Sequence, residues 1–163
     1  MDNFYEQLNK TEKSPIYSIM KLLSYTFFIL AAIFLIIFNF LLFSVSLIFG
    51  LVLFFVKNKF LLEYEYAYIN GKLDIDVIVE KIKRKKVISF NVRDIEAYGD
   101  ESLTDMTKYK HMAKIINAIS TNDKNKVYGI YVIIENQKYY IRFTPDKKFY
   151  DLINRNNRRA EIR

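Results

Sequence analysis

Residues 22 to 56 read LLSYTFFILAAIFLIIFNFLLFSVSLIFGLVLFFV, a run of 35 residues without a charged side chain. One straight helix of that length would extend about 52 Å, whereas the hydrocarbon core of a bilayer is about 30 Å thick. Two antiparallel spans fit better, and we expect them at residues 17–38 and 40–56. Asn39, the only amide in the run, tolerates the left-handed conformation that a turn needs. The sequence therefore predicts a transmembrane helical hairpin.

Other interpretations of this run differ in how deeply it enters the membrane. Each half is close to the lower length limit of about 17 residues for a spanning helix, so a re-entrant or shallow hairpin is the main alternative. A soluble chain of 163 residues has too small a core to bury the run. A signal peptide would have a shorter apolar region, about 7–15 residues, before a small-residue cleavage site. Ser44, Ser46 and Gly50 lie near one helical face and form either a close-packing seam or ordinary membrane-facing surface.

Basic residues flank the apolar run at both ends and are absent from its turn. Lys10, Lys13 and Lys21 precede it, and Lys57 and Lys59 follow it. Because cytoplasmic flanks carry the excess of Lys and Arg, we expect a multi-pass protein of the cell membrane with both termini in the cytoplasm.

The chain after the hairpin changes to the two-residue period of β-strands. Residues 61–69 alternate, Asn70-Gly71 is the preferred dipeptide of a tight hairpin turn, and residues 72–79 alternate again. Further strands are expected at 127–134, at 138–143 and at 87–98, whose second half continues or bends the strand. The segment 99–110 is polar and irregular, with room for a short helical turn. Residues 112–119 fit a strand or a helix by pattern alone, and their position in the fold favours a strand. Thr144 as N-cap, Pro145 and Asp146 predict the start of an amphipathic helix. The last residues are basic and expected to fray.

These elements predict an α+β domain after the transmembrane hairpin. Its fold class is a PH-like curled antiparallel sheet or barrel, closed by the C-terminal helix that covers its open end. The expected division is a polar segment at 1–16, the transmembrane hairpin at 17–56, a cytoplasmic PH-like domain at 57–156 and a basic tail at 157–163.

Several passages resemble a family of small, uncharacterised bacterial membrane proteins that have two transmembrane helices and a β-rich domain. They are LEYEYAYINGKLDID at 62–76, the Lys/Arg cluster that follows, VISFNVRDIEAYG at 87–99 and RFTPDKKFYDLI at 142–153. The passage from Lys83 to Ile95, which ends in Arg93-Asp94-Ile95, is similar to bacterial PH-like domains. The resemblance covers residues 22 to about 155 and implies the fold, but it brings no activity and no catalytic residues.

The sequence offers little for catalysis, metal binding or a cofactor. His111 is the single histidine, cysteine is absent and the four glycines are scattered, which excludes a histidine or thiol metal cluster and a glycine-rich phosphate loop. The pairs Asp74/Asp76 and Asp94/Glu96 share strand faces and are expected to face solvent. We therefore expect no enzyme, no cofactor and no metal.

One feature stands out from this background, a basic cluster in the segment KIKRKK. The basic cluster consists of Lys81, Lys83, Arg84, Lys85 and Lys86. In a loop close to an anionic membrane surface, such charges attract lipid head groups. Residues 57–163 also carry the whole net charge of +7, but without stacking aromatics we expect no nucleic acid.

Three functions follow from these features. The preferred one is a non-enzymatic, membrane-anchored interaction module whose PH-like domain binds a protein partner, a second copy of itself or anionic lipid head groups. The alternative is a small accessory subunit of a membrane complex that binds through its helical hairpin. An enzyme acting on lipid or envelope precursors is the third, and it lacks a visible catalytic constellation.

Overall fold

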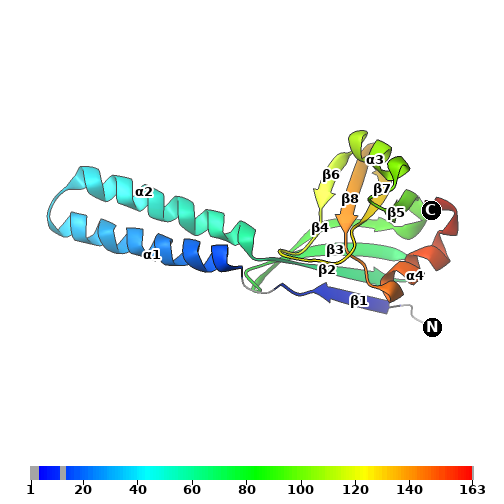
Figure 1. The fold of residues 1–163 in the computed structure, drawn as a ribbon, viewed down its shortest axis with the longest axis horizontal. Coiled ribbons are helices and arrows are strands. Elements are labelled where there is room, and N and C mark those ends of the chain that lie inside the picture. Colours follow the sequence, from blue (N-terminus) through cyan, green and yellow to red (C-terminus); the bar gives the residue numbers. More distant parts are fainter. Residues whose placement is uncertain (1–3, 12–13, 163) are drawn as a thin grey trace.

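The computed structural model describes residues 4–11 and 14–162 and places them in two parts. A helical hairpin projects from one end of a β-rich domain, so that the molecule is elongated (Figure 1). The strands of the domain form two sheets, and two α-helices pack against them.

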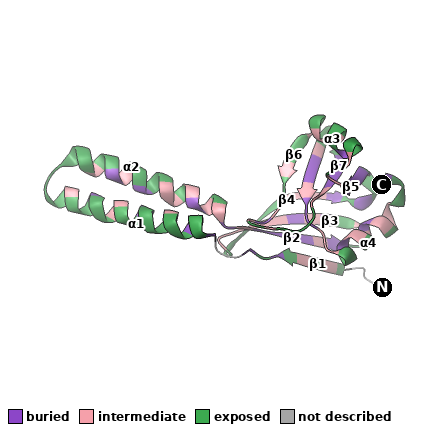
Figure 2. Cartoon of the chain, viewed as in Figure 1, coloured by how far each residue is buried: buried purple, intermediate pink, exposed green. Residues whose placement is uncertain are grey.

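The hairpin consists of α1 (Pro15–Ile36) and α2 (Phe40–Val56), followed by the short 3₁₀ helix η1 (Lys57–Phe60). Both helices are long and apolar enough to cross a membrane, and most of their large apolar side chains are exposed (Figure 2). In the turn Phe38, not Asn39, has a positive φ of 56°. Asn39 instead caps α2, because its side chain accepts a hydrogen bond of 3.2 Å from the backbone N–H of Leu42.

Small residues bring the two helices close together. The Ser24 hydroxyl donates to the Gly50 carbonyl at 3.2 Å, and Ser46 and Gly50 are buried in the interface. A Cβ at Gly50 would lie 2.8 Å from the ring of Phe28, closer than real contacts allow. Of the two interpretations of these residues, a close-packing seam therefore holds for Ser46 and Gly50. Ser44 lies outside it, exposed and bonded to its own helix.

The first sheet is antiparallel and has four strands in the order of the sequence. They are β1 (Phe4–Asn9), β2 (Leu62–Ile69), β3 (Lys72–Val79) and β4 (Lys83–Asn91). The β-hairpin predicted around Asn70-Gly71 is confirmed, and both turn residues have positive φ.

Strand β1 lies in the segment 1–16, where the sequence indicated only polar chain. It pairs with β2 along its whole length, from Phe4 opposite Ile69 to Asn9 opposite Tyr64. The helical hairpin is thus inserted between two neighbouring antiparallel strands. This pairing places the start of α1 and the end of α2 at the same end of the domain, as both spans of one hairpin require.

The second sheet has the strand order β5-β7-β8-β6. Its elements are η2 (Val92–Asp94), β5 (Ile95–Asp100), α3 (Thr104–His111), β6 (Lys114–Asn117), β7 (Tyr128–Ile134) and β8 (Gln137–Phe143). The strand expected within residues 112–119 is confirmed as β6, which runs parallel to β8. Among the described residues the two sheets remain separate, so the curled sheet does not close into a barrel.

The last helix, α4 (Lys147–Asn156), buries Phe149 and Ile153 in the core between the sheets. It begins later than predicted, because Asp146 is the N-cap and accepts the Phe149 N–H at 2.7 Å. Thr144 was expected in that role, but it is fully buried and bonds Asn9 instead.

Residues 158–162, the last that the structure describes, lie against the domain, contrary to the fraying expected for the tail. After the 3₁₀ helix η3 (Arg158–Ala160), the Ile162 N–H donates to the Tyr98 carbonyl at 2.8 Å. Ala160 is buried in the main core. The expected fraying was wrong because backbone pairing with β5 holds this segment.

Candidate membrane-facing site

The basic cluster lies at the turn between β3 and β4. Lys81 lies in the turn, and Lys83, Arg84, Lys85 and Lys86 are the first four residues of β4. The sequence placed all five in a loop, and the structure corrects this. The strand fixes alternate side chains on opposite faces of an exposed sheet edge, so the cations are spaced along a rigid element.

This turn is joined to the base of the helical hairpin. The Glu80 carboxylate forms an ion pair with Lys57, the first residue after α2, and accepts a hydrogen bond of 2.9 Å from the Tyr17 hydroxyl of α1. The Glu80 N–H donates to the Leu61 carbonyl at 3.0 Å. We call the contacts among Tyr17, Lys57 and Glu80 the latch. They place the β3–β4 turn where both helices leave the domain.

Lys57 is well enclosed despite its charge. Its side chain is 4% exposed, and its ammonium lies 4.4 Å from the centre of the Phe54 ring and 5.5 Å from that of Tyr17. Aromatic faces attract a cation, and the Glu80 carboxylate supplies the opposite charge. Lys57 therefore holds Glu80 at a defined point beside the end of α2, and its hydrogen bond keeps the pKa of Glu80 below its usual range.

Three of the five cluster residues are paired with acids on neighbouring strands. Lys81 lies 3.3 Å from Glu63, Lys86 lies 2.8 Å from Asp74, and Arg84 contacts Glu65. Glu63 and Glu65 are buried under these cations, and burial raises the pKa of Glu65, an effect that the nearby Glu6 reinforces. These pairs tie β4 to β2 and β3.

Lys83 and Lys85 differ from the other three. Both are exposed, and within the described part of the chain neither has an acidic partner. Their ammonium groups are the cations of the cluster that remain available for an external anion. No local pattern distinguishes these two lysines from the other three cluster residues, because sheet pairing alone brings the acidic partners of the other three near them.

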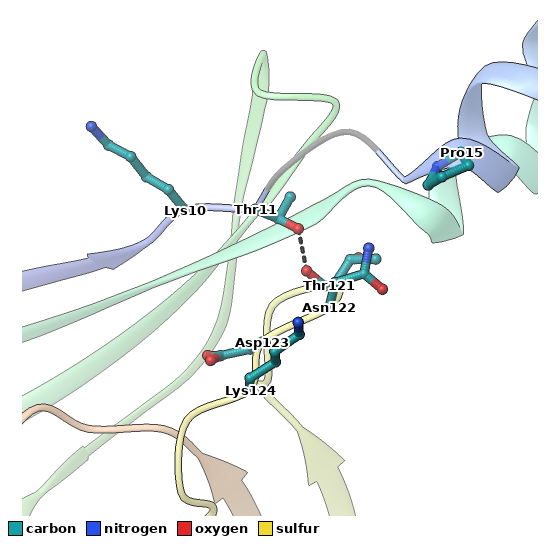
Figure 3. A pocket seen from close by; sticks show the side chains of 7 residues that line it. All are labelled: Lys10, Thr11, Pro15, Thr121, Asn122, Asp123 and Lys124. Carbon is teal, nitrogen blue, oxygen red and sulfur yellow. Dashed lines mark hydrogen bonds between the residues drawn. The ribbon is translucent and has the colours of Figure 1, made fainter.

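A polar cavity of about 640 Å³ lies on the same end of the domain (Figure 3). Its lining comes from Lys10, Thr11 and Pro15 before and at the start of α1, and from the loop Thr121–Lys124. Thr11 donates its hydroxyl to the Thr121 carbonyl, which closes one side of the cavity. The lining presents ammonium, hydroxyl and amide groups and the carboxylate of Asp123 beside the first residue of a membrane-length helix. Sequence reasoning missed this cavity, since its two walls are far apart in the chain.

In each of the two acidic pairs considered in the sequence, the structure gives one residue, Asp74 or Asp94, a side-chain hydrogen-bond partner. Asp74 accepts hydrogen bonds from Lys86 and Ser89, which hold its pKa low against the effect of partial burial. Asp94 accepts from Asn91 at 3.3 Å. Among the described residues, no group of three or more potential ligands is placed to hold a metal ion.

The domain consists of two four-stranded sheets with the helix α4 packed in the core between them, and it is attached to an apolar helical hairpin. The model of one family, described as bacterial PH-like domain (DUF6106), matches residues 1–162. The chain belongs to this family. Comparisons with curated proteins and with solved structures gave no match.

Proposed function

We propose that this protein is a non-enzymatic interaction module, anchored in the cell membrane by the α1–α2 hairpin, whose PH-like domain binds anionic lipid head groups of the same membrane. The observation that carries the proposal is the position of Lys83 and Lys85. Both are exposed and have no acidic partner among residues 4–11 and 14–162, and they lie at the start of β4, next to a turn that the latch holds at the base of the hairpin.

The flanking charges support a cytoplasmic orientation of both termini. Lys10 and Lys21 lie before or early in α1, and Lys57 and Lys59 follow α2. The pairing of β1 with β2 supports one side for both flanks. The positive-inside rule then favours the cytoplasm, where the leaflet carries the anionic lipids.

The expected strength of docking follows from the free cations. Each lysine near an anionic leaflet contributes about 1 kcal/mol, so Lys83 and Lys85 together contribute about 2 kcal/mol. That corresponds to about a 30-fold change in the ratio of docked to undocked domain. The hairpin tether raises the effective concentration of head groups, so this modest energy is sufficient.

The test uses the full chain in lipid vesicles and a probe on the part of the domain far from the hairpin. The chain has no cysteine, so Lys72→Cys at the start of β3 accepts a single fluorescent donor, and lipid-bound acceptors report its height above the bilayer. Phosphatidylglycerol should bring the donor closer than phosphatidylcholine alone, and high salt should reverse the effect.

A charge-matched control separates the cluster from net charge. Changing all five cluster residues to Gln should abolish the response to phosphatidylglycerol. The control changes five cations on α4 and η3 to Gln, at the end opposite the hairpin (Figure 1), and should respond like the parent protein: Lys147, Lys148, Arg155, Arg158 and Arg159. An unchanged response of the cluster variant would falsify the proposal.

A protein partner is the second candidate, favoured by an exposed apolar surface on the second sheet. Met112, Ile115 and Ile133 are 64%, 50% and 40% exposed. Ile115 and Ile133 share the sheet face that α3 only partly covers, because Ile115 is paired with Tyr140 and Ile133 lies two residues from Tyr131. Crosslinking of the full chain in membranes, with and without Ile115→Lys, tests this candidate. Loss of a defined crosslinked partner or dimer on substitution supports it.

A further inference from the structure

The β3–β4 turn carries an apolar side chain at its tip. Ile82 is 81% exposed, the largest exposed fraction among the large apolar side chains of the described residues, including those of the two apolar helices. It is flanked by Lys81 and Lys83. An isoleucine this exposed in a tight turn is unusual, because turns favour Gly, Asn, Asp and Pro.

The latch fixes where this tip lies. Glu80 contacts Lys57, which directly follows the last apolar residue of α2. Ile82 is two residues from Glu80, which is at most about 7 Å along an extended chain. The tip therefore lies at the end of the domain where α2 leaves the apolar span.

The backbone of the turn is held in a conformation that its residues do not favour. Glu80 and Lys81 have φ of 52° and 61°, and the Ile82 N–H donates to the Val79 carbonyl at 3.1 Å. Side chains larger than Gly or Asn rarely adopt positive φ. Such conformations persist where the surroundings hold them and concentrate at functional positions. The contacts of Glu80 with Lys57, Tyr17 and Leu61 supply that restraint.

We propose that Ile82 inserts into the interfacial region of the bilayer that holds the hairpin. This would be a contact with the membrane in addition to those of the hairpin and the basic cluster. The partner is the lipid surface itself, at the boundary between head groups and acyl chains. Lys83 extends its apolar stem beside Ile82 and places its ammonium group at the level of the phosphates, whereas Lys81 stays paired with Glu63. The inference rests on the membrane anchoring in the proposed function, and it adds an apolar contact that does not require anionic lipid.

The test places an environment-sensitive fluorophore at the tip of the full chain in vesicles. Ile82→Cys is compared with Ile69→Cys, an exposed apolar position at the end of β2 away from the hairpin. Lipids that carry nitroxides just below the head groups should quench the probe at 82 about threefold more than the probe at 69. This difference should appear in phosphatidylcholine and in mixtures with phosphatidylglycerol.

A second experiment needs no fluorophore at residue 82. With the donor at Lys72→Cys, Ile82→Glu should raise the domain away from the bilayer in phosphatidylcholine, whereas Ile69→Glu should not. Equal quenching at 82 and 69, or no effect of Ile82→Glu, overturns the insertion. If the phosphatidylglycerol response of the basic cluster persists in that case, head-group docking stands without insertion. If quenching at 82 persists while that response is absent, insertion stands without it.

Discussion

The burial of the latch allows an estimate of the unfolding free energy that is lost when its ion pair is broken. The perturbation is a double-mutant cycle of Lys57→Met and Glu80→Gln. The Lys57 side chain is 4% exposed and that of Glu80 25%. Breaking a fully buried pair by removing one partner costs about 3–5 kcal/mol, and the partial exposure of Glu80 reduces this. We therefore expect each single variant to lose about 2–3 kcal/mol of unfolding free energy.

The pair also predicts a pH dependence with a definite sign. The folded protein holds the pKa of Glu80 below its ordinary value of 4.5, so the unfolded chain takes up a proton first as the pH falls. The stabilisation is complete above pH 4.5 and is lost as the pH drops through the lower pKa of the folded state. Glu80→Gln should remove this part of the acid sensitivity.

The assay is thermal unfolding of the full chain in detergent micelles, followed by near-ultraviolet circular dichroism of the tyrosines. An exposed pair of the same chemistry, Lys108 and Asp105 at 2.7 Å with side chains 66% and 61% exposed, serves as the control. Its coupling energy should be much smaller because solvent screens the pair, whereas about 1–3 kcal/mol is expected for Lys57 and Glu80. Equal coupling energies in the two cycles would refute the view that the latch holds the turn to the hairpin.

Three further predictions concern the core, the helix seam and β1. Tyr66→Phe removes a fully buried hydroxyl that donates to the Ala118 carbonyl at 2.6 Å and accepts from the Thr144 N–H, so it should cost about 2–4 kcal/mol in a denaturant titration. Tyr139 is half-buried but its hydroxyl donates only to Gln137 in an exposed bond, so Tyr139→Phe should cost less than about 0.5 kcal/mol. Gly50→Leu should force the two helices apart and lower the free energy of unfolding by about 1–3 kcal/mol, measured by thermal unfolding of the helices. A substitution at an exposed position of the same helix should cause no such loss. Deleting residues 1–11 removes β1 and exposes the edge of β2, so faster amide exchange across β2 is expected; unchanged exchange would show that β1 is dispensable.

An element could be predicted from the sequence where its own residues determine its conformation, and not where distant residues hold it in place. The turn at Asn70-Gly71 was predictable, because the positive φ values are a property of those two residues. The turn at Glu80-Lys81 has the same backbone sign but no such residues, and it is held by Lys57 and Tyr17. These partners lie 23 and 63 residues away in the sequence, so no local pattern could indicate it.

Strand β1 was missed for a related reason. Its six residues, FYEQLN, are mostly exposed or half-buried and occupy a sheet edge. What makes them a strand is pairing with β2 and the hydrogen bonds of Gln7 and Asn9 to Thr144, more than 130 residues away. Edge strands carry weak sequence signals because one face and one edge remain in solvent.

The candidate site was likewise predictable from the sequence only in part. All five basic residues and the apolar run were visible in the sequence, because charge and hydropathy are composition. Which cations are free was not visible, since Glu63, Glu65 and Asp74 neutralise three of them only through cross-strand register. The missed residues, Glu80 and Ile82, stand out only by what they contact and by how far they are exposed.

The sequence by itself determined the helical hairpin, the β-rich class of the domain and the closing helix. Each follows from periodicity and length, which act over a few residues. Tertiary structure alone decided that the hairpin is inserted between paired strands, and that the basic turn is latched to the hairpin base. Both depend on free energy from contacts between distant segments, which exist only once the chain has folded.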